Sequence, residues 1–312
     1  MNVIAKYGKS FLGDTVNYLL GRSSHPNGYL PFQPEPVREL MNRVAGMFNR
    51  GEMEKRVNAA RENASRAGFE IPRDDGFKVF PPGGLAGADE LIGSITKRME
   101  TEDIAAHMAN SKNPYSKDYL LMYFVDRKTL ELDSPFLKLA LRDDILAAVS
   151  NYFGFVPIVN YVDIWYSRPN ESTQFKGSQL YHCDWEDLTK MRIFLFCNDV
   201  DGQSGPLTAI SAKKSKEIRD AIDYRWGTRV GDDAINAHIK EGEAIPLAGP
   251  KGTVGFADAS RCFHYGSRVQ TKIRIMGMIH YITPFAFDLK RPFARLAHSG
   301  LPEMQRLALG AR

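Results

Sequence analysis

The chain changes character after Pro157, and this change constrains the fold more than any other feature. From there on, short segments rich in β-branched and aromatic residues alternate with turn residues, as is typical of antiparallel strands. The segments are 158–166, 192–197, 206–210, 252–256 and 272–283. A charged stretch, 213–243, separates the third segment from the fourth and predicts one or two surface helices. The sequence therefore predicts a β-rich core that carries a helical insert.

The first half of the chain has a helical pattern instead. Apolar residues recur at helical spacing over 37–47, and further helices are expected over 88–109 and 134–153. Ser134 and Pro135 fit the N-cap and first turn of the last of these helices, and Gly154 fits its end.

Because no linker or internal repeat divides the chain, we expect a single domain over 1–312. Its expected parts are a mostly helical stretch 1–156 that packs on the core, a core over 157–290 with a helical insert at about 212–243, and a tail over 291–312.

Composition places the chain among ordinary globular proteins. Apolar residues make up 43% and charged residues 25%, which excludes fibrous, collagen-like and wholly disordered chains. The net charge of +4 is small and scattered, so we expect no nucleic acid, and charge alone leaves the kind of partner open. Three cysteines without a Cys-x-x-Cys pair argue against a disulfide framework and favour the cytoplasm.

The sequence predicts no transmembrane segment, because it has no apolar run of the roughly 18 residues that a spanning helix needs. The stretch 2–21 carries apolar residues at helical spacing with lysines between them. Two interpretations of it stay open: a helix packed on the body of the protein, and an interfacial helix in peripheral contact with a membrane. The pattern does not indicate an oligomeric state.

His182 and Asp184 form a His-x-Asp pair beside a predicted strand, and His264 lies next to another. In an extended chain, residues i and i+2 point to the same side, so one ion can reach both members of the pair. Two histidines and one carboxylate leave ligand positions open, as non-haem Fe(II) requires when it also binds a cosubstrate and dioxygen. We therefore predict His182, Asp184 and His264 as metal ligands and catalytic residues. A further histidine, His280, is interpreted as an ordinary residue.

Arg274 stands in a strongly strand-like run after His264. An arginine there would lie beside the metal, where its planar guanidinium can bind a carboxylate through two hydrogen bonds. Arg268 is the alternative residue for this role.

The spacing of His182, Asp184, His264 and Arg274 resembles that of the Fe(II)/2-oxoglutarate dioxygenases. Three stretches extend the resemblance to the phytanoyl-CoA dioxygenase-like (PhyH) branch of that family. They are Tyr-His-Cys-Asp at 181–184, the strand and Asp-rich turn at 194–207, and the glycine-rich approach at 252–256 that leads to His-Tyr-Gly-Ser at 264–267. The resemblance covers roughly 158–287. It implies a mainly β core folded as a double-stranded β-helix, or cupin-like jelly roll, buttressed by N-terminal and inserted α-helices.

The resemblance also implies a reaction. His182, Asp184 and His264 would bind Fe(II), Arg274 would form a salt bridge with 2-oxoglutarate, and O2 would be the second cosubstrate. The enzyme would hydroxylate an unactivated C–H of a small metabolite or lipid-like substrate and release succinate and CO2. Phe194 and Trp165 are further candidate cosubstrate contacts, and Gln179, Trp185 and Arg268 are candidate substrate contacts.

Two other classes stay open at this point. A non-catalytic jelly-roll metal-binding protein could carry the same three ligands, but it would have no use for Arg274. A zinc-dependent hydrolase could use them with a bound water, and would need a general base near the metal, for which Glu186 is the candidate.

Overall fold

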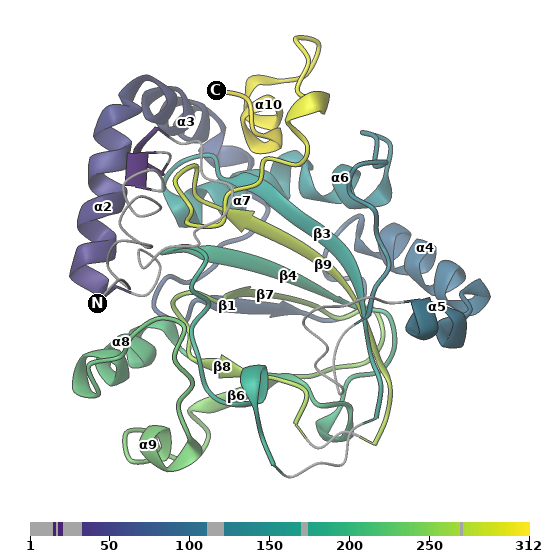
Figure 1. Ribbon diagram of the computed structural model, residues 1–312. Coiled ribbons are helices and arrows are strands. Elements are labelled where there is room, and N and C mark those ends of the chain that lie inside the picture. Colours follow the sequence, from purple (N-terminus) through teal and green to yellow (C-terminus); the bar gives the residue numbers. More distant parts are fainter. Residues whose placement is uncertain (1–14, 17, 21–32, 111–121, 170–173, 269–270) are drawn as a thin grey trace.

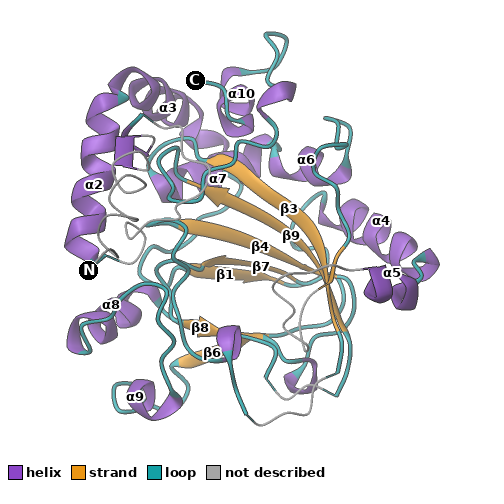
Figure 2. Cartoon of the chain, in the orientation of Figure 1, coloured by secondary structure: helices purple, strands orange, loops and turns teal. Residues whose placement is uncertain are grey.

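The computed structural model describes residues 15–16, 18–20, 33–110, 122–169, 174–268 and 271–312 (Figure 1). Most of the N-terminal stretch 2–21 lies outside these residues, and with it the predicted N-terminal helix. No helix in the described part of the chain is both long and apolar enough to cross a membrane. Two antiparallel sheets face each other, and helices surround the larger one (Figure 2).

Nine strands are described. They are β1 (Phe77–Phe80), β2 (Met122–Tyr123), β3 (Ile158–Ser167), β4 (Lys190–Phe196), β5 (Leu207–Ile210), β6 (Ala244–Leu247), β7 (Val254–Asp258), β8 (His264–Tyr265) and β9 (Arg274–Ile282). The larger sheet has the order β1-β7-β4-β9-β3-β2, and the smaller has the order β6-β5-β8. All neighbouring strands are antiparallel.

The order in which the chain visits the two sheets defines the fold. After β3 in the larger sheet, an antiparallel bridge pairs His182 with His264 and so adds this segment to the smaller sheet beside β8. The chain then returns to the larger sheet in β4, crosses to β5 and β6, returns in β7, crosses to β8 and ends in β9. This alternation is the topology of a double-stranded β-helix, or jelly roll. The predicted mainly β fold with N-terminal and inserted helices is confirmed.

The helices lie outside the two sheets (Figure 1). They are α2 (Glu35–Phe48), α3 (Arg50–Asn63), α4 (Ala88–Thr101), α5 (Ile104–Asn110), α6 (Pro135–Ala140), α7 (Asp143–Phe153), α8 (Ala212–Ala221), α9 (Asp232–Asn236) and α10 (Glu303–Leu309). Short 3₁₀ turns are η2 (Ala64–Arg66), η3 (Gly177–Gln179), η4 (Gly202–Ser204) and η5 (Ala294–Leu296).

Two of the predicted helices are each divided in the structure. The stretch 88–109 breaks at Glu102, whose backbone is extended, because the side chain of Asp103 accepts a hydrogen bond from the Ala106 amide and begins α5 anew. The stretch 134–153 breaks at Arg142, which is also extended. Gly154 ends α7 in the left-handed conformation at φ 81°, as the sequence predicted.

The main hydrophobic core lies between the larger sheet and the helices α4, α6 and α7. Ile193 and Leu195 of β4 meet fully buried residues of α7 such as Ile145 and Leu146 there. A second cluster packs the insert against the smaller sheet, and its members are Tyr181, Cys183, Ile210, Ile218, Tyr224, Trp226, Ile235 and Phe263. The insert therefore covers the segment that carries His182.

Candidate metal centre

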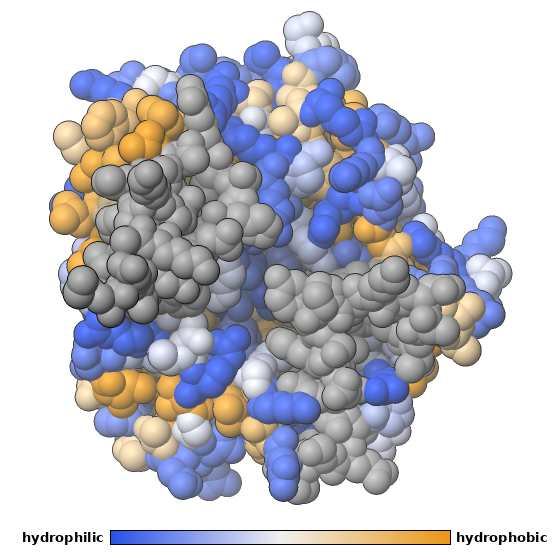
Figure 3. Space-filling view, in the orientation of Figure 1, coloured by the Kyte–Doolittle hydropathy of each residue, from blue (hydrophilic) through white to orange (hydrophobic). Residues whose placement is uncertain are grey.

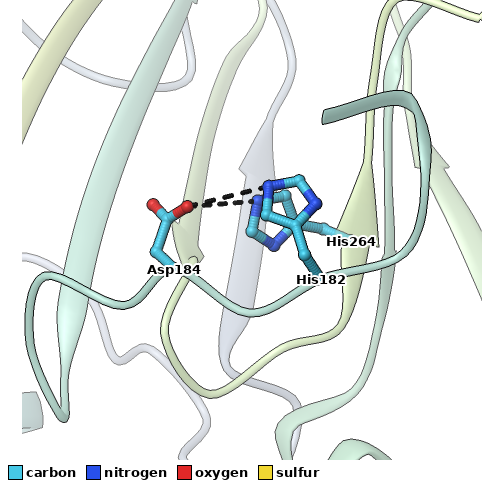
Figure 4. Close-up of side chains that lie close together, drawn as sticks. All are labelled: His182, Asp184 and His264. Carbon is cyan, nitrogen blue, oxygen red and sulfur yellow. Dashed lines mark ion pairs between the residues drawn. The ribbon is translucent and has the colours of Figure 1, made fainter. Parts of the chain in front are cut away.

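The three predicted metal ligands lie together between the two sheets. One donor atom from each of His182, Asp184 and His264 lies within 4.8 Å of the other two (Figure 4). The Oδ1 atom of Asp184 is 3.8 Å from Nε2 of His182 and 3.7 Å from Nε2 of His264. All three side chains are buried.

Backbone pairing holds these side chains on one face. The amides and carbonyls of His182 and His264 exchange two hydrogen bonds of 3.0 Å, so the histidines stand opposite each other on neighbouring strands. Opposite residues of an antiparallel pair point to the same face. The Asp184 amide donates to the Ala259 carbonyl at 2.8 Å, which fixes the third ligand.

Both imidazoles present Nε2 toward the centre. Nδ1 of His182 lies 2.9 Å from the Leu180 carbonyl, and Nδ1 of His264 lies 3.0 Å from the Cys262 carbonyl. A carbonyl only accepts, so we assign the proton to Nδ1 and the lone pair to Nε2. Burial lowers the pKa of His264 to about 4 and that of His182 well below its usual value. Both rings are thus neutral near pH 7, as metal binding requires.

Asp184 is charged and held from its other side. Its Oδ2 atom forms ion pairs with Arg192 and with Nζ of Lys190, the latter at 3.1 Å. Burial acts to raise the pKa of Asp184, but the charges of Arg192 and Lys190 hold it well below its usual range. The carboxylate therefore turns Oδ1 to the histidines while cations hold Oδ2.

This donor set fits a divalent transition metal ion. Bonds from such an ion to imidazole nitrogen or carboxylate oxygen are about 2.0–2.2 Å long, so one ion can join donors roughly 4 Å apart. The carbonyl partners of both Nδ1 atoms and the cations on Oδ2 are the outer contacts that orient ligands at protein metal sites.

The loop after Asp184 is fixed by an arginine that the sequence analysis did not single out. Arg38 of α2 is fully buried and donates to the carbonyls of Trp185, at 3.1 Å, and Asp187, at 2.8 Å. Its guanidinium lies 4.3 Å from the ring centroid of Trp226 and 4.8 Å from that of Phe287. The N-terminal helices thus help to position the carboxylate ligand.

A cavity of about 340 Å³ opens beside the three ligands. Its lining comes from both sheets, with β3, β4 and β9 on one side and Leu207 and His264 on the other. In Figure 3, the surface between the grey regions of the face drawn is coloured mainly as hydrophilic.

Arg274 lines this cavity and is buried. It contacts the Gly205 carbonyl, and its Nη2 lies 2.8 Å from Oγ of Ser267 and 3.4 Å from Oγ of Ser167. Its Nε atom has no hydrogen-bond partner, and no acidic side chain among the described residues pairs with it. Burial lowers its pKa to about 10, so the guanidinium remains charged at pH 7. A buried cation without an anion is costly, which indicates a place for an anionic ligand.

The structure places the other predicted site residues in two groups. Phe194, Trp165 and Trp185 line the cavity. Gln179 and Arg268 are not in its described lining: Gln179 donates to the Ser267 carbonyl at 2.6 Å, and Arg268 binds both carboxylate oxygens of Asp232 at 2.7 and 2.8 Å.

The cavity also holds polar residues that the sequence analysis did not assign to it. Lys190 and Arg192 stand two positions apart in the otherwise apolar β4, and this alternation was the available signal. His280 lines the cavity outside the metal-binding group, stacks on Tyr161 at 4.6 Å between ring centroids, and leaves Nε2 unpartnered.

The fold and the site together define a jelly-roll protein with a buried two-histidine, one-carboxylate centre. No family model matches the chain, and no curated protein matches it, so membership of the phytanoyl-CoA dioxygenase-like branch stays a prediction.

Several solved structures are similar to this chain at low identity. The epimerase SnoN in complex with Fe3+, alpha ketoglutarate and nogalamycin RO is 15% identical, with a TM-score of 0.42 over 72% of this chain and 84% of that one. EctD from S. alaskensis with 2-oxoglutarate and 5-hydroxyectoine is 14% identical, with a TM-score of 0.46 over 72% and 76%. AviO1 from Streptomyces viridochromogenes Tue57 is 15% identical, with a TM-score of 0.41 over 73% and 96%.

Proposed function

We propose that this protein is a non-haem Fe(II)- and 2-oxoglutarate-dependent oxygenase that hydroxylates a C–H bond of a small organic substrate. One observation carries the proposal. A cluster of two neutral histidines and a charged aspartate shares one cavity with Arg274, a buried arginine that no acidic side chain among the described residues pairs with. Two histidines and one carboxylate are typical of a metal ion that keeps coordination positions open for other ligands. A buried arginine is typical of a site that binds a carboxylate.

His182, Asp184 and His264 would hold the iron. Arg274 and Ser267 would bind the distal carboxylate of 2-oxoglutarate, the former by charge and the latter by its hydroxyl. When bound, the iron and 2-oxoglutarate supply the activation of O2, with succinate and CO2 as products. Phe194 and Trp165 would line the chamber and keep bulk water from the reacting groups.

The two alternative classes find less support. In a zinc hydrolase, Glu186 would act as general base, but its Oε1 is engaged in an ion pair with Nζ of Lys190 at 2.9 Å. Neither a hydrolase nor a non-catalytic metal-binding protein explains the buried charge of Arg274, with which no carboxylate in the described segments pairs.

The test is an anaerobic titration of the metal-free protein with Fe(II) and then with 2-oxoglutarate. We expect the weak visible charge-transfer band that a chelating keto acid produces on Fe(II), and its absence in His182→Ala. Release of succinate with a substrate would follow. Tight zinc binding without any such band would overturn the proposal.

A further inference from the structure

The insert between β5 and β6 brings a third side chain into line with the two histidines. Val230 and Tyr181 exchange two backbone hydrogen bonds, of 3.1 and 2.9 Å, in an antiparallel bridge. Arg229 precedes Val230 and His182 follows Tyr181, so continuing this antiparallel alignment by one position sets Arg229 opposite His182. Because opposite residues of an antiparallel pair point to the same face, Arg229, His182 and His264 form a row across the smaller sheet. Arg229 accordingly lines the cavity.

Among the described residues, the Arg229 guanidinium contacts backbone carbonyls and no carboxylate. Nη1 of its guanidinium lies 3.4 Å from the Gly227 carbonyl and 3.3 Å from the Thr228 carbonyl, and no acidic side chain in the described part of the chain forms an ion pair with it. Arg229 is also close enough to His182 and His264 to affect their pKa values. Besides burial, the positive charge of Arg229 lowers the pKa of both His182 and His264.

The other cations of the described lining already have partners. Lys190 pairs with Glu186 and Asp184, and Arg192 pairs with Asp184. Lys290 lies 3.1 Å from Asp288. Arg274 would bind the distal carboxylate of 2-oxoglutarate. Arg229 is therefore the cation that remains for a second anionic ligand.

From this row we infer that Arg229 binds an anionic group of the primary substrate, a carboxylate or a phosphate, so that the substrate is a small organic anion. The inference rests on the proposed function and specifies its substrate class. Because Arg229 lines the same cavity as His182 and His264, an anion bound to its guanidinium would share the cavity with the proposed metal site. A planar guanidinium favours carboxylate and phosphate because it offers paired donors.

The test measures binding rather than turnover. The protein is loaded with Mn(II) in place of Fe(II) and saturated with 2-oxoglutarate, and the paramagnetic relaxation of ligand protons is followed by NMR. The probes are three acid and neutral pairs: phenylacetate with phenylacetamide, hexanoate with hexanamide, and glycerol 3-phosphate with glycerol. We expect at least one anion to bind at least about tenfold more tightly than its neutral partner, as a charge-assisted hydrogen bond provides. Arg229→Gln should abolish that preference, and Arg229→Lys should retain part of it.

Arg225→Gln is the matched control, because Arg225 lies in the same insert, is exposed and pairs with Asp223 at 3.2 Å. It should keep the wild-type preference. If Mn(II) or 2-oxoglutarate does not bind to the wild type, the proposed function fails and the inference with it. With both bound, the inference alone is overturned if no anion binds, if acids and neutral partners bind alike, or if Arg229→Gln keeps the preference. It is also overturned if Arg229→Gln weakens the binding of 2-oxoglutarate instead, since Arg229 would then bind the cosubstrate.

Discussion

The two sheets face one cavity but contribute different chemistry to it. The smaller sheet, with the bridged segment at 181–182, supplies the neutral nitrogen donors of His182 and His264. The larger sheet supplies cations, among them Arg192 of β4 and Arg274 of β9. The smaller sheet thus presents the proposed nitrogen ligands, and the larger sheet presents the cations that pair with Asp184 or are placed for the cosubstrate.

The two sheets also differ in what supports them. The larger sheet rests on the main hydrophobic core with α4, α6 and α7, whereas the smaller sheet is covered by the insert through the second cluster. A change in the smaller sheet or its cover should therefore alter metal binding first. A change at Arg274 on the cavity face of the larger sheet should alter anion binding and leave the metal in place, because Arg274 does not contact the three proposed ligands.

The largest expected effect comes from the smaller sheet. His182→Ala removes one of the three proposed metal ligands, so we expect the Fe(II) affinity to fall by more than the roughly 10–100-fold that loss of an outer contact costs. His280→Ala is the matched histidine on the larger sheet, and it should leave the affinity within a few-fold of wild type. Calorimetric titration with Fe(II) under anaerobic conditions measures both. Equal losses in the two variants would show that His280 also binds the metal.

A large but different effect is expected from Arg274. Removing a charged hydrogen-bonding group costs about 1.5–3 kcal/mol, so Arg274→Ala should weaken 2-oxoglutarate roughly 10–100-fold while Fe(II) affinity stays unchanged. Arg268→Ala is the control, because Arg268 is engaged with Asp232 outside the described cavity lining. Titration of the Fe(II) protein with 2-oxoglutarate compares the two. If Arg268→Ala has the larger effect, the clamp has been assigned to the wrong arginine.

An intermediate effect concerns pH and stability. Burial, followed by the charge of Arg192, lowers the pKa of His280 well below the usual value of 6.5. As pH falls below 6.5, His280 becomes protonated in the unfolded chain but stays neutral in the folded protein. Stability is therefore complete above pH 6.5 and declines below it, by up to about 1.4 kcal/mol per pH unit for one histidine.

Urea unfolding of the metal-free protein over a pH series tests this. His182 and His264 have lowered pKa values for the same main reason, burial, and add to the slope. His280→Gln should therefore make the decline shallower without removing it. An unchanged slope would mean that His280 is protonated, or exposed to water, in the folded protein.

The sequence predicted that His182 and Asp184 lie together because their signal is local. His182 and Asp184 are two positions apart, and extended backbone alone brings such residues to one side. The strand-like run around Arg274 likewise made the cavity's buried cation predictable. That the chain forms one domain stays a prediction.

The remaining parts of the site depend on contacts between distant segments, which a local pattern does not reveal. Arg229 lies in a charged insert whose sequence predicts surface helices. The bridge between Val230 and Tyr181 brings this part of the insert to the cavity, which Arg229 lines. The strand β6 was also not predicted, because Pro246 interrupts its pattern. Pro246 is tolerated because β6 is an edge strand, bonded to β5 alone.

The smallest expected effect comes from packing changes in the two hydrophobic clusters that cover the sheets. Ile218 of α8 and Ile145 of α7 are both fully buried, the first in the insert's cluster and the second in the main core. Replacing either with valine removes one methylene group and should lower the free energy of unfolding by about 0.5–1.5 kcal/mol.

Metal affinity should distinguish the two variants. Tyr181 and Cys183, which flank His182, pack in the same cluster as Ile218, so Ile218→Val loosens the cover over a metal ligand, whereas Ile145→Val loosens the far side of the larger sheet. We expect Ile218→Val to weaken Fe(II) binding a few-fold and Ile145→Val to leave it unchanged at equal loss of stability. Calorimetric titration with Fe(II), beside urea unfolding of each variant, gives both quantities. If both variants lose metal affinity equally, the two sheets act as one rigid unit, and the insert has no special part in holding the metal ligands.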